Sequence, residues 1–196
     1  MRSELSATGV GAPVLRREDP RLLQGRGEFS DDLNLQGQLH AVMVRTTYAH
    51  ADIRAVDTSA AMAMPEIIAV LTGADYVADG IGDLCHVANP AGTEDWQKPA
   101  FVNRDGSAPF DRAQPSIVRD RVRHSGEIVA VVIGETAAVA RDAADLVTVS
   151  YNALPVVTNA LAALEAGAPN IWEDCPDNVA LDAEMGDAAA TDAAFA

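Results

Sequence analysis

The sequence predicts an α+β domain, and three observations support this prediction. Short runs rich in β-branched residues recur between turn-forming residues, which is typical of strands in a packed sheet. Residues 136–147 repeat apolar side chains at helical spacing. This predicted helix lies between strand-like runs at 128–133 and 147–151. A strand, a helix and a strand so close in sequence suggest a split α/β unit.

The residues before the first strand are predicted to be mostly irregular. Residues 1–13 are small and polar and predict a loose tail. The charged stretch 16–33 contains one proline and two glycines. It predicts an ordered loop with a single helical turn at Pro20 to Leu23.

Two strands, a short helix and a third strand are predicted next. The strands span Gln38 to Arg45, about Ile53 to Val56, and Glu66 to Gly73, where a β-branched run ends at a glycine. Between the second and third strands, a polar residue at 57–59 can cap a short Ala/Met helix that Pro65 ends.

The segment VRTTYAHADI, Val44 to Ile53, joins the first two predicted strands. It places a cation, two hydroxyls, an aromatic ring and a histidine directly after an apolar run. Such a cluster can form a reaction site, and it can equally form a turn that positions two strands. These residues alone leave both interpretations open.

Residues 74–114 show no periodicity and predict a long loop, in which Trp96, Phe101 and Phe110 are scattered. A loop of this length is uncommon in a compact domain unless it has a function or packs on a neighbour. We expect it to form the docking side of the domain, together with the acidic C-terminal tail. The alternative is that the aromatic rings fold back on the domain's own core.

The second half of the chain contains the clearest strand and helix signals. A short strand near 118–122 and a buried strand at 128–133 flank a break at Ser125 and Gly126. At Gly126 we expect a positive φ or a close approach of the backbone.

The helix at 136–147 can be capped by Thr136. Its predicted apolar stripe consists of Ala137, Ala140, Ala144 and Val147. A strand follows with Val149 and Tyr151 on one face, and a second short helix is capped after Asn159. The chain then runs into an acidic, alanine-rich tail.

The charge balance excludes two classes of partner. Asp and Glu number 29 against 14 Lys and Arg, a net charge of −15, and such a surface repels nucleic-acid phosphates and anionic lipid.

No run approaches the roughly 20 apolar residues of a membrane span, and the first residues do not resemble a secretory signal. Cys85 and Cys175 lack CxxC spacing, so we expect no disulfide framework and a reducing, cytoplasmic setting.

No residues form a recognisable catalytic or metal-binding pattern. The histidines His40, His50, His86 and His124 are dispersed, and no pair has the i, i+4 spacing of a helical zinc motif. Cys85 adjoins His86, but adjacent residues of an extended chain point to opposite sides and make poor catalytic partners.

Two glycine motifs are also weak. Gly25-Arg-Gly27 resembles the start of a dinucleotide fingerprint, but it follows no strand and lacks the third glycine. Gly134-Glu135-Thr136 joins a strand to a helix, whose N-terminus can hold an anion. Because that loop is short and Glu135 would repel phosphate, a plain βα turn is favoured. These residues favour a non-catalytic domain over a complete enzyme.

Three stretches combine into a family pattern. They are RREDPRLLQGRGEFSDDL at 16–33, GQLHAVMVRTTYAHADIRAVDTSAAMAMPEIIAVLTGAD at 37–75, and RDRVRHSGEIVAVVIGETAAVARDAADLVTVSYNALPVV at 119–157. Together they resemble the molybdenum-carrying large subunit of the xanthine dehydrogenase and aldehyde oxidase family, and within it the carbon monoxide dehydrogenase-like branch. Ser125 and Ile128 stand where such proteins usually have Val and Pro. Both residues can occupy extended backbone, so the resemblance holds.

The resemblance implies an a/b hammerhead domain, a mixed β-sheet with flanking helices, at residues 14–180. Residues 1–13 would be a flexible tail, and 181–196 an acidic tail or linker toward a molybdopterin-binding part. The intact enzyme would hydroxylate an aldehyde or N-heterocycle, or oxidise carbon monoxide, with water as the oxygen source. Its molybdenum would be held by molybdopterin cytosine dinucleotide in the large subunit. Partner domains or subunits would carry 2Fe-2S clusters and FAD.

The family's pterin-binding loops and active-site residues lie beyond the matching stretches. No catalytic, cofactor-binding or metal-binding residue is therefore assigned, and we expect no cofactor on this chain alone. The resemblance favours a structural role for the corner at Arg45 to Ala51, with Tyr48 and His50 packed or hydrogen-bonded. Two alternatives remain: a free-standing non-enzymatic partner, and a small-molecule-binding module built on the loop at 74–114.

Overall fold

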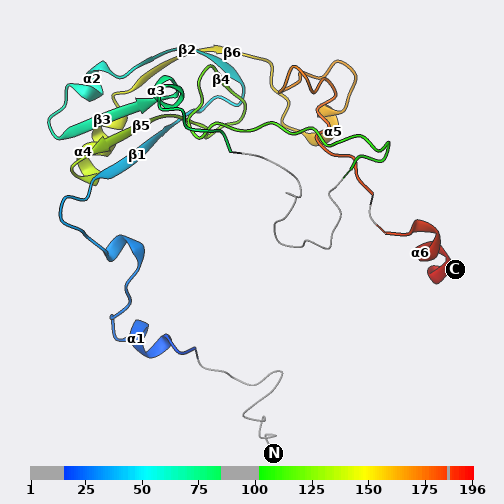
Figure 1. The fold of residues 1–196 in the computed structure, drawn as a ribbon, viewed down its shortest axis with the longest axis horizontal. Coiled ribbons are helices and arrows are strands. Elements are labelled where there is room, and N and C mark those ends of the chain that lie inside the picture. The colour runs from blue at the N-terminus through cyan, green and yellow to red at the C-terminus, as the bar shows by residue number, and fades with distance from the viewer. Residues whose placement is uncertain (1–15, 85–101, 185) are drawn as a thin grey trace, which may run out of the picture. The chain divides into compact units, whose positions relative to one another are not determined.

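The computed structural model describes residues 16–84, 102–184 and 186–196, drawn as a ribbon in Figure 1. By its internal contacts the chain divides into two units, Met1–Gln38 and Leu39–Ala196. The described part of the first unit contains helix α1 (Asp19–Leu23) and the 3₁₀ turn η1 (Ser30–Asp32). Pro20 lies in the first turn of α1, where its missing N–H costs no hydrogen bond. The helical turn predicted there is confirmed.

The strands of the second unit form two sheets (Figure 1). The first sheet has the order β1-β5-β3, with β1 (His40–Arg45), β5 (Ile128–Gly134) and β3 (Ile67–Thr72). The second has the order β4-β2-β6, with β4 (Arg121–Val122), β2 (Ala51–Asp57) and β6 (Thr148–Ala153). The α+β class is confirmed. The strands in the described ranges differ from the single mixed sheet implied by the resemblance, because every pairing is antiparallel and the strands divide between two sheets.

Helices flank the first sheet, as expected: α2 (Ser59–Met62), α3 (Gly73–Ala78) and α4 (Ala137–Ala144) contact its strands. Two more helices, α5 (Ala160–Ala163) and α6 (Ala188–Phe195), follow later in the chain. The strands on either side of α4, β5 and β6, belong to different sheets. The split α/β unit predicted from their order is therefore wrong, because a hydrophobic pattern shows that a strand is buried without showing which strands it joins.

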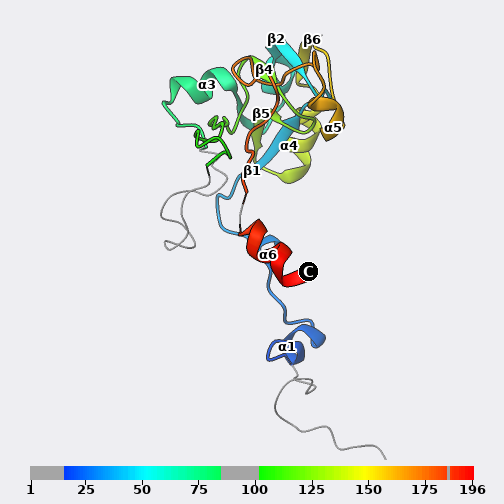
Figure 2. The ribbon, with the colours of Figure 1, turned by 90° about the vertical axis from the view of Figure 1, so that its right-hand side faces the viewer.

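Helix α4 lies against β1 and β5 (Figure 2). The hydroxyl oxygen of Thr136 accepts a hydrogen bond from the amide of Val139 at 3.2 Å, so the predicted cap is confirmed. The predicted stripe is only partly correct. Ala140 is buried as expected, but Ala137 is exposed and Ala143 is buried instead. In a helix with so many alanines, spacing alone does not show which side faces the sheet.

Two clusters of buried side chains form the core of the second unit. In one, Val129 of β5 packs with Ala51 and Val122 of the second sheet, and this cluster joins the two sheets. In the other, Val132 of β5 packs with Ala143 of α4 and holds that helix on the first sheet. Burying such side chains provides the main driving force for folding.

Helix α3 was not predicted, and the loop expected at 74–114 begins inside it. The carboxylate of Asp75 accepts hydrogen bonds at 2.7 Å from both the amide and the hydroxyl of Thr72, and this capping starts the helix. Tyr76 is buried, and its hydroxyl donates to the carbonyl oxygen of Gly82 at 2.6 Å. Six residues are too few for a helical period to be visible in the sequence.

Tyr48 and His50, in the corner between β1 and β2, are packed or hydrogen-bonded as expected. Thr46 and His50 are 3% and 5% exposed. The amide of Thr46 donates to the carbonyl oxygen of Glu127 at 2.9 Å, and Nδ1 of His50 lies 3.1 Å from the carbonyl oxygen of Pro155. The ring of Tyr48 packs on that of Tyr151, with centroids 4.7 Å apart. These contacts hold the turn that sends the chain from one sheet to the other.

Candidate functional site

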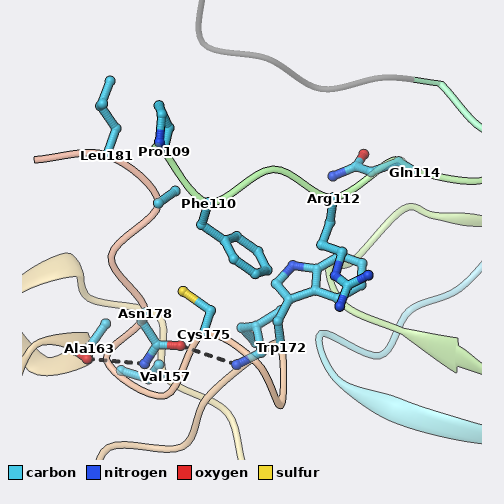
Figure 3. A pocket seen from close by; sticks show the side chains of 12 residues that line it. Pro109, Phe110, Arg112, Gln114, Val157, Ala163, Trp172, Cys175, Asn178 and Leu181 are labelled. Atoms are coloured by element: carbon cyan, nitrogen blue, oxygen red, sulfur yellow. Dashed lines mark hydrogen bonds between the residues drawn. The ribbon is translucent and has the colours of Figure 1, made fainter. Parts of the chain in front are cut away.

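Two irregular segments of the second unit, residues 109–114 and 157–181, enclose a cavity of about 480 Å³. Its lining is mainly apolar, and the rings of Phe110 and Trp172 lie side by side, tilted by 54° with centroids 6.2 Å apart (Figure 3). We call this the Phe110–Trp172 cavity. Its volume lies within the roughly 300–1,000 Å³ that is usual for small-molecule sites.

The segment on one side of this cavity is ordered by asparagine side chains. Asn159 caps α5 by accepting hydrogen bonds from the amides of Leu161 and Ala162, as predicted for this short helix. Asn178 has a positive φ of 58°. Its side chain accepts from the amide of Ile171 at 3.1 Å and donates to the carbonyl oxygen of Ala163 at 3.1 Å (Figure 3). Beyond the short helix α5, the segment thus keeps a defined shape without regular secondary structure.

The other side of the cavity is tied to the start of the C-terminal tail. The amide of Phe110 donates to the carbonyl oxygen of Ala180 at 2.9 Å. Earlier in the same loop, the guanidinium of Arg104 pairs with the carboxylate of Asp182 at 2.6 Å. The predicted loop and the tail therefore lie side by side. Phe110 packs on Trp172, and Trp96 and Phe101 lie outside the described residues.

Ion pairs line a second hollow beside Trp172, with a volume of about 540 Å³. Arg121 bridges Asp52 at 2.7 Å and Glu173 at 3.2 Å. The hydrogen bond from Arg121 holds the pKa of the Asp52 carboxyl below its usual range, and Asp52 raises the pKa of Arg121. Arg119 pairs with Asp83 at 2.7 Å. These pairs connect β2, β4 and the loops around the cavity.

Ion pairs of this kind are partly exposed, so they position the loops more than they stabilise the fold.

Cys175, which lines the cavity, has a thiol of low reactivity. Its side chain is buried, and this burial raises the pKa of the thiol. A raised pKa leaves less of the nucleophilic thiolate. Cys85 and His86 lie outside the described residues.

The remaining sequence candidates are separated in the structure. His40 lies in β1, His50 in the corner after it and His124 in the turn before β5. Within residues 16–84, 102–184 and 186–196, no group of three or more His, Cys, Asp or Glu side chains could hold a metal ion. Among the described helices, none has both the length and the apolarity needed to cross a bilayer.

Of the two aromatic residues that shape the cavity, the sequence singles out Phe110 but not Trp172. For residues 159–180 it predicts only a short helix capped after Asn159. A signal was available: a tryptophan and three asparagines in an irregular, proline-containing stretch often anchor a packed loop. The contact of Trp172 with Phe110 could not be predicted, because Phe110 lies some 60 residues earlier in the chain.

Known proteins resemble this chain along most of its length. The profile of the family "Aldehyde oxidase and xanthine dehydrogenase, a/b hammerhead domain" matches residues 24–97 and 94–155. Nicotine 6-hydroxylase large subunit of Paenarthrobacter nicotinovorans is 39% identical over 172 residues, 88% of this chain and 19% of that protein. Carbon monoxide dehydrogenase large chain of Afipia carboxidovorans is 34% identical over 200 residues, 96% of this chain and 22% of that protein.

Solved structures show the same similarity. Quinoline 2-oxidoreductase from Pseudomonas putida 86 superposes with a TM-score of 0.65 at 39% identity, covering 79% of this chain and 18% of that chain. A Cu,Mo-CO dehydrogenase superposes with a TM-score of 0.69 at 32% identity, covering 95% of this chain and 22% of that chain. The chain thus spans about one fifth of the length of the curated relatives it matches.

Proposed function

The chain belongs to the aldehyde oxidase and xanthine dehydrogenase family, within its a/b hammerhead domain, and on this premise we propose that it serves as the N-terminal hammerhead segment of a molybdenum hydroxylase large subunit. The complete protein would be an oxidoreductase of the cytoplasm. It would hydroxylate an aldehyde or N-heterocycle, or oxidise carbon monoxide, with water as the oxygen source. The observation that carries this proposal is the match of 88–96% of the chain to large subunits named for such reactions.

The role of this segment is structural. Among the described residues, no group of His, Cys, Asp and Glu side chains offers a ligand set for molybdenum or an iron–sulfur cluster. The described residues therefore do not fit such a metal centre, and no reaction step is assigned to them. A molybdenum–molybdopterin cytosine dinucleotide cofactor would supply the oxidation chemistry from the rest of the large subunit. Iron–sulfur and FAD domains or subunits would then take up the electrons.

The docking side toward the rest of the subunit is the surface around the Phe110–Trp172 cavity. It combines two features typical of interface cores, an apolar hollow and half-buried aromatic side chains. The loop at 103–110 and the start of the tail at 180–182 lie together on this surface. The proposal keeps 14–180 as the domain, with 1–13 as a flexible tail and 181–196 as a linker.

Co-expression tests this function. The chain should co-purify with a polypeptide comprising the part of nicotine 6-hydroxylase large subunit that it does not match. Hydrogen exchange should then slow in residues 103–114 and 171–182, because docking buries their amides. A matched control is α4, whose packing is internal and whose exchange should not change. A chain that remains free would contradict the function. If the two polypeptides bind but hydrogen exchange slows only outside residues 103–114 and 171–182, the proposed docking side is wrong and the function stands.

A second prediction concerns the isolated chain, which we expect to carry no molybdenum, iron or flavin. Metal analysis and a visible absorption spectrum of the purified chain check this. A stoichiometric metal or a coloured cofactor would overturn the purely structural role. The same preparation tests the alternative of a small-molecule-binding module, favoured by the size and apolar lining of the cavity. That alternative requires a bound organic molecule to be released on denaturation and detected by mass spectrometry.

A further inference from the structure

The hollow beside β4 contains four arginines, and one of them differs from the rest. Arg112 forms an ion pair with Asp174, Arg119 with Asp83, and Arg121 with Asp52 and Glu173. The fourth, Arg123, has no carboxylate within ion-pair distance among the described residues. It lines both the hollow already described and an adjoining one of about 430 Å³, so solvent reaches the site.

The position of Arg123 is well defined. Its guanidinium lies over the ring of Trp172, with Cζ 3.8 Å from the ring centroid. Stacking on an aromatic face leaves the N–H groups pointing outward in the guanidinium plane. Nη1 reaches only the carbonyl oxygen of Arg121, at 3.4 Å, and Nε is buried without a hydrogen-bond partner in the described part of the chain.

The neighbouring carboxylates are engaged elsewhere. The side chain of Glu127 accepts hydrogen bonds from the backbone amides of Arg123 and His124. Glu173 is paired with Arg121. Glu127, Asp120 and Glu173 favour the charged form of Arg123 through their fields, without an ion pair to it in the described part of the chain. Burial dominates and lowers the pKa of Arg123, so this cation is incompletely compensated.

Half-buried charges in folded proteins are normally paired, and an orphaned buried donor is costly. We propose that the cleft between β4 and Trp172 binds a small oxyanion, a carboxylate or phosphate group, through Arg123. The anion accepts hydrogen bonds from the outward edge of the guanidinium while Trp172 holds the guanidinium plane. The proposal is independent of the function of the intact subunit, because it rests only on this cleft.

Titration with sodium phosphate and with sodium acetate at low ionic strength tests the site. Trp96 and Trp172 are the only tryptophans, so a Trp96→Phe background isolates the fluorescence of Trp172. A saturable change is expected with at least one of these anions, and none with sodium chloride at equal ionic strength. Saturation by phosphate alone identifies a tetrahedral ligand, and saturation by acetate a carboxylate. A response to both salts that merely follows ionic strength would overturn the proposal.

Matched arginine variants identify the residue responsible. Arg123→Met should weaken anion binding by about tenfold or more, since charge-assisted hydrogen bonds are lost. Arg141→Met removes an exposed arginine of α4, and it should leave the affinity unchanged. Line broadening of the phosphate ³¹P signal on the unmodified chain gives a readout that requires no variant. Equal affinities for the two variants, or no broadening by the unmodified chain, would refute the site.

Discussion

Replacing Gly73 by alanine is expected to destabilise the chain more than any other single methyl addition among its described glycines. Gly73 is buried and opens α3. A Cβ there would overlap the carbonyl oxygen of Val118 and lie 2.7 Å from Cα of Arg119. Both atoms belong to the backbone that leads into β4, so no side-chain rotation relieves the overlap.

The expected loss in the free energy of unfolding for Gly73→Ala is about 3 kcal/mol, the upper part of the range for overpacking. The gain in helix propensity from alanine, about 1 kcal/mol at most, is too small to offset it. Urea denaturation followed by circular dichroism measures the difference. Gly82→Ala is the matched control, because a Cβ at Gly82 meets no atom within 4 Å. Equal stability of the two variants would show that the backbone near Val118 yields easily.

Replacing Gly126 by valine is expected to cost about 1–3 kcal/mol of folding stability, for a different reason. Its φ is +95°, a region that β-branched residues strongly disfavour. No atom lies within 4 Å of the position a Cβ would take, so the cost is backbone strain without steric overlap. The turn also matters because the amide of Gly126 donates to the carbonyl oxygen of Thr46 at 2.9 Å.

A thermal or urea melt of Gly126→Val checks this value. The neighbouring substitution Ser125→Val is the control, since Ser125 is exposed and has no positive φ. Its melting temperature should hardly change, whereas that of Gly126→Val should fall. If both variants have the same melting temperature as the unmodified chain, position 126 tolerates a β-branched residue and the strain argument fails.

Local sequence patterns were sufficient to predict much of the secondary structure. The strands β1, β3 and β5, the cap of α4 by Thr136 and the cap of α5 by Asn159 follow from signals within a few residues. The positive φ of Gly126 also follows from its position before a buried strand. In each case the physical cause is local: side-chain burial on alternating positions, an orphaned amide at a helix start, or a turn that only glycine adopts easily.

The cavity and the arginine cleft could not be predicted in the same way. Arg121 meets Asp52 across 69 positions, and Phe110 meets Trp172 across about 60. Arg123 becomes distinctive only because its three neighbouring arginines find carboxylates on other segments. An ion pair depends on atoms within about 4 Å, and charge spacing along the chain carries no such information.

By itself the sequence determined the family, the α+β class, most strands and helices, and the packing of Tyr48 and His50 in the corner between β1 and β2. Only the tertiary structure decided that the strands divide into two antiparallel sheets and that β5 and β6 separate. It also decided which loops enclose the cavity and which arginine lacks a partner. The reason is that burial and backbone preference are encoded residue by residue, whereas strand pairing and site geometry depend on which distant segments pack together.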